Sequence, residues 1–141
     1  MAETNREKLD RFGMSPVFSG SPEEAIRTQR SLLHADFEII EAPSLPYGGT
    51  YRGGEGWAQL IEDVKKAWAG VKVTPLWTLG EHDGDRFAKM YRISGTARTT
   101  GIKFDMQVFE LWEFEDGLIR RTVPYYFDTA ELRDAHRGTG S

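Results

Sequence analysis

The sequence predicts an α+β fold in which helices pack on one side of a curved, mostly antiparallel sheet. Two observations carry this prediction. Residues 54–70 place apolar side chains at the spacing of one helix face. From residue 71 to residue 127 the pattern changes to strand segments separated by turn sequences, which is typical of an antiparallel meander.

The N-terminal region is expected to contain two helices and one strand. Residues 4–12 carry alternating charges and two apolar residues spaced by three, which predicts a short helix. Residues 21–24 form a capping box with proline at the first helical position, so a second helix should begin there and end near residues 34–36. Residues 37–43 then predict a strand that stops at its final proline.

The middle of the chain combines a glycine-rich segment with the clearest helix. Residues 44–56 predict an irregular loop, which we interpret as a mobile lip over a pocket. From Gly54 to Gly70 the sequence predicts an amphipathic helix, whose apolar face comprises Trp57, Leu60, Ile61, Val64 and Trp68.

The remaining chain predicts four strands and a terminal helix. The strands are expected at residues 71–81, 86–97, 104–115 and 118–127. Asp116 and Gly117 form a typical hairpin turn between the last two strands. A capping box at residues 128–131 opens the terminal helix.

Glu110 is the most informative single residue. At the strand period of two it shares a face with five large apolar side chains: Phe104, Met106, Val108, Trp112 and Phe114. A buried carboxylate is costly unless it is hydrogen-bonded or neutralised. We therefore interpret Glu110 either as an acid/base group in an apolar pocket or as a structural carboxylate bonded to Arg92, Tyr91 or Tyr125 across the sheet. The opposite face of this strand is apolar in its middle, which indicates partial burial by another subunit.

Glu41 is the second candidate carboxylate. It shares its strand face with Phe37 and Ile39, so we expect it to point into the same apolar space as Glu110. The alternative is a strand-end carboxylate that the break at Pro43 turns outwards. A tyrosine hydroxyl in the pocket, from Tyr125 or Tyr91, would donate a proton to a carbonyl oxygen or an oxyanion.

Two further residues are candidates with a simpler alternative. His34 is expected at a helix end near the pocket mouth, either as an acid/base group or as a cation that favours the helix dipole. Asp128 is either an acid/base group or only the cap of the terminal helix. The residues expected to bind substrate are the aromatic side chains Tyr47, Tyr51, Trp57, Trp77, Tyr91, Trp112 and Phe127.

Composition excludes several classes of function. The 141 residues fit one domain spanning residues 1–141, and the chain contains no cysteine for disulfides, thiol nucleophiles or thiolate metal ligands. A net charge of −4 argues against nucleic-acid or anionic-membrane partners. With no apolar run long enough to cross a bilayer and no secretory signal, a cytoplasmic location is expected. No histidine or carboxylate spacing suggests a metal, and no cofactor is expected.

Several segments together resemble the SnoaL-like branch of the nuclear transport factor two-like superfamily. They are residues 39–43, 51–53, 108–112 with 115–117, and 124–130. The resemblance implies a conical α+β barrel, commonly a homodimer, with a deep apolar pocket. Ketosteroid isomerases, limonene epoxide hydrolases, polyketide cyclases, dehydratases and non-catalytic adaptors share this shape, so the resemblance says more about fold than about reaction.

The carry-over of functional residues from this superfamily is partial. Against ketosteroid isomerase, Glu110 matches the protonated aspartate that donates to the oxyanion, a role described for that enzyme, while its general base falls on Ala42, next to Glu41. Against limonene epoxide hydrolase, an essential aspartate falls on Tyr125, which argues against epoxide hydrolysis. Against the polyketide cyclases, a late acid/base aspartate corresponds to Asp128.

Two hypotheses follow from the sequence. The first is a cofactor-free acid/base enzyme, an isomerase, dehydratase or aldol-type cyclase that acts on a small apolar carbonyl compound of polyketide or steroid-like type. In it Glu41 is the base, Glu110 a neutral donor and Tyr125 an assisting donor. The second is a non-catalytic ligand-binding or dimerisation module. An inward carboxylate pair without a cationic partner would favour the enzyme, and a Glu110 clamped by arginine would favour the module.

Overall fold

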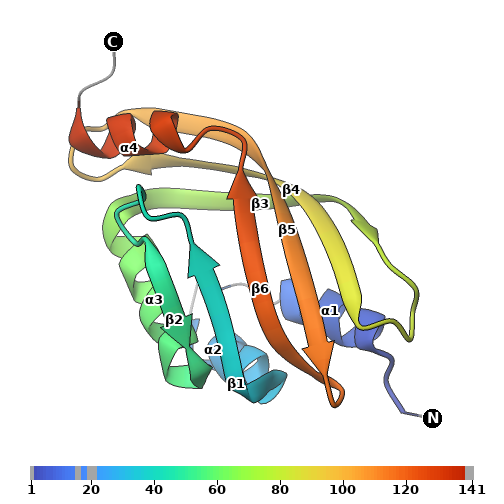
Figure 1. Cartoon of the computed structure of the whole chain (residues 1–141). Helices are drawn as coiled ribbons and strands as arrows, with labels where there is room; N and C mark the ends of the chain where they lie inside the picture. Colours follow the sequence, from blue (N-terminus) through green and yellow to red (C-terminus); the bar gives the residue numbers. More distant parts are fainter. Residues whose placement is uncertain (1, 15–16, 19–21, 139–141) are drawn as a thin grey trace.

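The computed structural model describes residues 2–14, 17–18 and 22–138, and within them the chain forms four helices and one six-stranded sheet (Figure 1). In chain order these elements are α1 (Asn5–Gly13), α2 (Pro22–Ser31), β1 (Leu33–Glu41), β2 (Gly49–Arg52), α3 (Gly53–Ala67), β3 (Trp68–Leu79), β4 (Arg86–Ala97), β5 (Lys103–Glu115), β6 (Leu118–Tyr126) and α4 (Thr129–Arg137).

The sheet has the strand order β2-β1-β6-β5-β4-β3. Strands β3 to β6 form the predicted antiparallel meander. The first strand, β1, pairs parallel with β6 and antiparallel with β2. The predicted α+β class with a curved, mostly antiparallel sheet is therefore confirmed, and the cone that the sheet forms is not closed.

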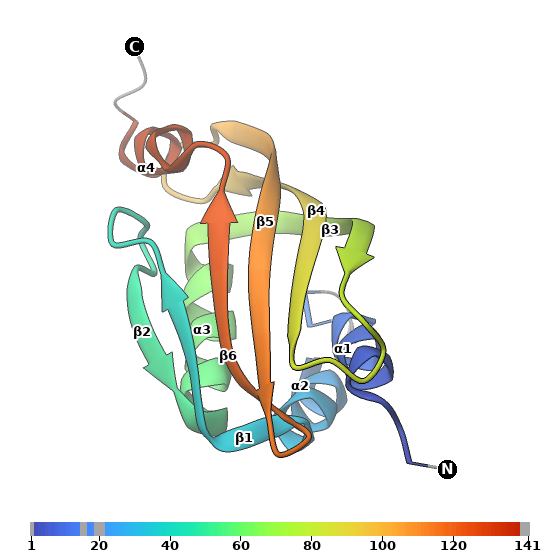
Figure 2. The same ribbon diagram turned by 45° about the vertical axis from the view of Figure 1, so that its right-hand side comes forward.

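Strong curvature gives the sheet a concave face. Register shifts interrupt the β3–β4 pairing at residues 69–72 and 75–77, and irregularities of this kind bend a strand and increase its twist. In both views β3 passes behind β5 and β6, and α3 lies on that same side of the sheet (Figures 1 and 2). The α3 helix contacts β1, β2 and β3, while α1 and α2 lie towards one end of the sheet and α4 towards the other.

The chain enters β1 earlier than the sequence predicts. The second helix ends at Ser31, and residues 34–36 belong to β1 rather than to the helix end. Leu33 pairs with Ile119 of β6. This pairing between residues far apart in the sequence decides the boundary, because strand preference depends on context more than helix preference does.

The glycine-rich segment is only partly irregular. Residues 49–52 form β2, which pairs with β1, and α3 begins directly afterwards at Gly53. Gly53 has φ 68°, a left-handed conformation that glycine adopts without a steric penalty. The prediction of a loop throughout residues 44–56 is therefore wrong.

Other local predictions are confirmed. Strand β4 has the predicted bounds, and Asp116 and Gly117 have φ 52° and 74° in the hairpin between β5 and β6. The Asp128 side chain accepts hydrogen bonds from the backbone N–H groups of Ala130 and Glu131 and so caps α4. Ser21, the first residue of the predicted capping box, lies outside the described residues.

The predicted apolar faces form the core. On β5 the alternate residues Phe104, Met106 and Val108 are buried, as are the predicted apolar residues of α3. Trp68, expected in the helix, begins β3 instead and is also buried. Among the described helices, no segment has both the length and the apolar character needed to cross a membrane.

Candidate functional site

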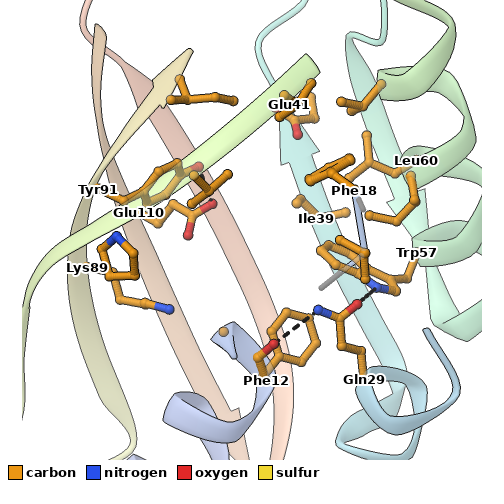
Figure 3. A pocket seen from close by; sticks show the side chains of 18 of the residues that line it. Phe12, Phe18, Gln29, Ile39, Glu41, Trp57, Leu60, Lys89, Tyr91 and Glu110 are labelled. Atoms are coloured by element: carbon orange, nitrogen blue, oxygen red, sulfur yellow. Dashed lines mark hydrogen bonds between the residues drawn. The ribbon is translucent and has the colours of Figure 1, made fainter. Parts of the chain in front are cut away.

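A pocket of about 500 Å³ lies between the concave face of the sheet, α3 and the C-terminal end of α1 (Figure 3). One wall is the apolar face of α3, which contributes Trp57, Leu60, Ile61 and Val64. The other walls come from β1, β3, β4, β5 and β6 and from residues of α1 and α2. Most of the lining is apolar, and its polar groups are few, as is typical of sites for small organic molecules.

Glu41 is buried at the end of β1, where its side chain lines the pocket with that of Ile39. Its side chain is 4% exposed, and the Tyr126 hydroxyl donates to Oε1 at 3.0 Å. Burial raises the pKa of Glu41 to about 8; the Tyr126 hydrogen bond lowers this pKa, and repulsion from the Glu110 carboxylate raises it. The alternative that Glu41 turns outwards at the end of its strand is therefore wrong.

A chain of hydrogen bonds supports Glu41 from one side. The indole N–H of Trp68 donates to the Tyr47 hydroxyl at 3.1 Å, and this hydroxyl lies 3.2 Å from that of Tyr126. An indole nitrogen can only donate, and the Tyr126 proton is already directed at Glu41, so Tyr47 donates to Tyr126. Every donor therefore points towards the carboxylate, which holds Glu41 Oε1 in place.

Glu110 projects from β5 into the same pocket, as predicted from its strand face. The Tyr91 hydroxyl donates to its Oε2 at 2.8 Å, and the indole N–H of Trp112 donates to Oε1 at 3.1 Å. Burial raises the pKa of Glu110, while the positive charge of Lys89 and these two hydrogen bonds oppose the rise.

No arginine clamps Glu110 within the part of the chain that the structure describes. Arg92 instead binds Asp105 at 2.6 Å between exposed side chains, because both residues lie on the outer face of the sheet. Of the three partners considered from the sequence, Tyr91 is confirmed, whereas Arg92 and Tyr125 are wrong. Sequence reasoning did not anticipate the cation of Lys89 beside this carboxylate.

Lys89 and Gln29 are pocket residues that the sequence analysis missed. Lys89 alternates with the inward residues Phe87 and Tyr91 on β4, so the strand period could have identified it. Gln29 is buried; it donates to the backbone oxygen of Phe12 at 3.1 Å and accepts from the Trp57 indole at 2.8 Å (Figure 3). No sequence pattern indicates this role, because these contacts join three separate helices.

The structure brings together about half of the predicted site residues. Glu41, Glu110, Tyr47, Trp57, Tyr91 and Trp112 all line the pocket. Tyr51 does not: its hydroxyl lies 2.8 Å from Asp63 Oδ2 and 3.1 Å from the backbone oxygen of Tyr47. Its hydroxyl therefore contacts the backbone of Tyr47 but does not line the pocket.

Tyr125 is on the wrong face for the predicted role. It pairs with Phe109 on the outer side of the sheet and is 56% exposed, whereas Tyr126 pairs with Val108 and lines the pocket. The outer face of β6 also carries apolar side chains, Val123 and Tyr125, so hydrophobicity did not indicate which side of this strand is inward. The tyrosine of β6 that lines the pocket is therefore Tyr126, and its hydroxyl donates to Glu41.

Trp77 and Phe127 also lie outside the pocket. Trp77 pairs with Met90 and contacts Phe109 on the outer face of the sheet, with ring centres 6.4 Å apart. Phe127 follows the end of β6 and is 84% exposed. Neither residue lines the pocket, because aromatic character alone does not distinguish the two faces of a sheet.

His34 and Asp128 are not pocket residues. Asp128 has the simpler of its two predicted roles, that of a helix cap. His34 lies within β1, and its Nε2 is 3.1 Å from Glu115 Oε2. The prediction that His34 ends a helix at the pocket mouth is wrong, because the strand begins before it.

One group of potential metal ligands occurs among the described residues, at the β5–β6 hairpin. Ligand atoms of His34, Glu115 and Asp116 lie within 4.8 Å of one another. The backbone N–H of Asp36 donates to His34 Nδ1 at 3.0 Å, so the neutral ring carries its proton on Nε2, the nitrogen that faces Glu115. This arrangement is a hydrogen-bonded pair and leaves no free imidazole lone pair for a cation.

Comparisons with known proteins agree with this architecture. A family model described as a SnoaL-like domain matches residues 23–122. A search of curated proteins finds no match. Among solved structures, an NTF2-like protein from Burkholderia thailandensis E264 is 21% identical with a TM-score of 0.82, over 95% of this chain and 98% of that one.

Two further solved structures are similar in shape. One is a putative SnoaL-like polyketide cyclase from Jannaschia sp. CCS1, 14% identical with a TM-score of 0.76 over 100% of this chain and 96% of that one. The other is TerC co-crystallised with polyporic acid, 20% identical with a TM-score of 0.75 over 94% of this chain and 98% of that one. At these identities the likeness concerns the fold.

Proposed function

The chain belongs to the SnoaL-like domain family, and from its pocket we propose that it is a cofactor-free acid/base enzyme acting on a small apolar carbonyl compound. The observation that carries the proposal is the pair of carboxyl groups, Glu41 and Glu110, in one apolar pocket, each hydrogen-bonded by a tyrosine hydroxyl. The reaction class is proton transfer next to a carbonyl, as in an isomerase, dehydratase or aldol-type cyclase.

Glu41 is the proposed base. A pKa of about 8 leaves about a tenth of this carboxyl ionised at pH 7, and an acid with a pKa near the working pH can both take and return a proton. The ionised carboxylate removes the proton on the carbon next to the carbonyl. That C–H bond breaks, an O–H bond forms on Glu41, and the electron pair moves to the carbonyl oxygen to give an enolate. The proton then returns to the same or another carbon.

Tyr91 is the proposed donor to the enolate oxygen. Its hydroxyl is held by Glu110 at 2.8 Å at the pocket wall. When Glu110 is protonated it can donate to Tyr91, which frees the Tyr91 proton to stabilise negative charge on the substrate oxygen. The raised pKa of Glu110 supports this arrangement, in which the carboxyl acts through the tyrosine.

A ligand-binding module remains the alternative. Both oxygens of Glu110 already accept hydrogen bonds, from Tyr91 and Trp112, which is also what a purely structural carboxylate would show. TerC co-crystallised with polyporic acid supports a small-molecule ligand under either reading. The two functions differ only in whether Glu41 moves a proton.

Hydrogen–deuterium exchange tests the proposal without the natural substrate. We expect the protein to accelerate exchange of the protons next to the carbonyl of 2-tetralone in deuterated buffer, followed by NMR. Glu41→Gln should lower the catalysed rate by about 10²-fold or more, since positioned general bases contribute on that scale. Tyr91→Phe should lower it by about 10-fold because the enolate loses one donor.

Tyr125→Phe is the matched control, since that hydroxyl faces away from the pocket. Its exchange rate should equal that of the wild type. Equal rates for the wild type and Glu41→Gln, with 2-tetralone bound by both, would refute the catalytic proposal in favour of the binding module.

A further inference from the structure

Lys89 places a positive charge in the pocket that the proton-transfer scheme does not use. Its side chain projects from the inward face of β4, two residues before Tyr91 (Figure 3). The ammonium lies 5.6 Å from the centre of the Trp112 ring. Within the described parts of the chain, no hydrogen bond or ion pair joins this ammonium to another residue.

Glu110 does not use the lysine as a hydrogen-bond partner. The two residues pair directly across β4 and β5, and the charge of Lys89 lowers the pKa of Glu110. Both Glu110 oxygens nevertheless accept from other donors, Tyr91 and Trp112. An ammonium carries three N–H donors, so those of Lys89 remain available to a group in the pocket.

The space occupied by the Lys89 ammonium is available because residue 13 is glycine. Gly13, the last residue of α1, lines the same pocket, and a Cβ at this position would lie 2.7 Å from Lys89 Nζ. The C-terminal end of a helix carries partial negative charge, so α1 stabilises a cation here without supplying a competing carboxylate.

We propose that Lys89 is the anion-binding residue of the pocket, and that the substrate is a carbonyl compound with a second, negatively charged oxygen, as in a carboxylate or phenolate. The Cα atoms of Lys89 and Tyr91 are about 7 Å apart along one strand face. Both side chains line the same pocket, so one ligand can place its anion at Lys89 and its carbonyl oxygen at Tyr91. This inference rests on the proposed function for the substrate site, for the carbonyl group and for the role of Tyr91; the anion contact at Lys89 does not depend on proton transfer.

Calorimetric titration with two probes of the same shape tests this assignment: 2-naphthoate, an anion, and 2-naphthamide, which is neutral. We expect the wild type to bind 2-naphthoate about 10-fold more tightly, the scale of one charge-assisted contact in a partly buried site. Lys89→Met keeps the apolar stem beside Trp112 but removes the charge. It should abolish this preference and leave the affinity for 2-naphthamide within about 2-fold.

Gly13→Ala provides a second variant that changes no charge. Gly13 has no left-handed φ, so alanine fits the backbone, and its methyl group displaces the flexible end of Lys89. We expect weaker binding of 2-naphthoate by several-fold and little change for 2-naphthamide. Lys72→Met is the control, because Lys72 also lines the pocket but is exposed to solvent. This variant should keep the preference for 2-naphthoate over 2-naphthamide.

Three results would overturn the proposal. The first is equal affinity of the wild type for both probes. The second is that Lys89→Met lowers the affinity for both probes by the same factor. The third is that the wild type shows no saturable binding of 2-naphthoate at about 1 mM. Neither probe has to react, so this experiment can fail while 2-tetralone exchange persists. Conversely, if the protein does not catalyse exchange of 2-tetralone, the preference for 2-naphthoate over 2-naphthamide still tests the role of Lys89.

Discussion

Glu41 shows how burial and one hydrogen bond together set the chemistry of a carboxyl group. Removal from water favours its protonated form, while the Tyr126 hydroxyl favours the ionised form. The balance leaves a pKa of about 8, against an ordinary value of 4.5. The protein therefore keeps this proton over a pH range in which the unfolded chain has released it.

This difference in pKa predicts a dependence of stability on pH. Between pH 4.5 and 8 the folded protein binds one more proton at Glu41 than the unfolded chain does. The free energy of unfolding should therefore fall as pH rises through this window, with a contribution of up to about 1.4 kcal/mol per pH unit. Below the window this contribution to stability is fully present, and above it the contribution is lost.

Glu41→Gln should flatten this decline, as measured by urea unfolding at several pH values. Glutamine keeps an oxygen that accepts from Tyr126 but does not titrate. Glu62→Gln, which changes an exposed carboxylate on α3, should leave the slope as in the wild type. An unchanged slope in Glu41→Gln would contradict a raised pKa at this residue. Glu110 also has a raised pKa, so part of the decline should persist in the variant.

At the scale of elements, α4 is the clearest case of a helix encoded by its ends. Asp128 caps its first turn, and Gly138 follows its last residue with φ 76°, in the left-handed region that glycine favours. The backbone N–H of Gly138 donates to the carbonyl oxygen of Asp134. Local signals of this kind need no distant partner, which is why the sequence could identify this helix.

Asp128→Ala should lower the free energy of unfolding by about 1 kcal/mol through loss of the cap, and urea unfolding measures this. Asp128→Asn should recover most of that loss, since asparagine also caps helices well. Exchange of 2-tetralone should be unchanged in both variants because Asp128 does not line the pocket. Lost exchange with unchanged stability would restore the acid/base role first considered for this residue.

Elements whose ends depend on distant partners were predicted less well. The sequence predicts that the second helix ends near residues 34–36, where β1 has already begun, and it gives no sign of β2 within the glycine-rich segment. Both are fixed by pairing in the sheet, β2 with β1 and β1 with β6. The sequence of a short edge strand carries little of this information, because its stability comes from cross-strand contacts.

At the scale of the whole molecule, the outer face of the sheet carries an apolar row. Trp77, Met90, Phe109 and Tyr125 follow one another across four strands, and Phe109 is 37% exposed. Exposed apolar surface of this kind marks interaction sites. The homodimer expected from the sequence stays a prediction, and this row is the surface we expect a second copy to cover.

Phe109→Glu should convert the expected dimer to a monomer, as measured by size-exclusion chromatography with light scattering. Two-fold symmetry would bring two new carboxylates into the same interface, where unpaired charges are costly. Ile102→Glu, at an exposed apolar residue before β5, should leave the dimer intact. A monomeric wild-type protein would contradict the prediction.

Local sequence patterns are enough to predict the order of elements other than β2, the amphipathic face of α3, the inward face of β5 and the carboxylate on that face. These features depend on local periodicity and capping, which neighbouring residues encode. Three further features appear only in the folded chain: Tyr126 rather than Tyr125 faces the pocket, Lys89 lies opposite Glu110, and Gln29 joins three helices. These facts follow from strand register and packing between distant segments. Because the outer face of the sheet also carries apolar side chains, such as Phe109 and Tyr125, hydrophobicity alone could not distinguish the two faces.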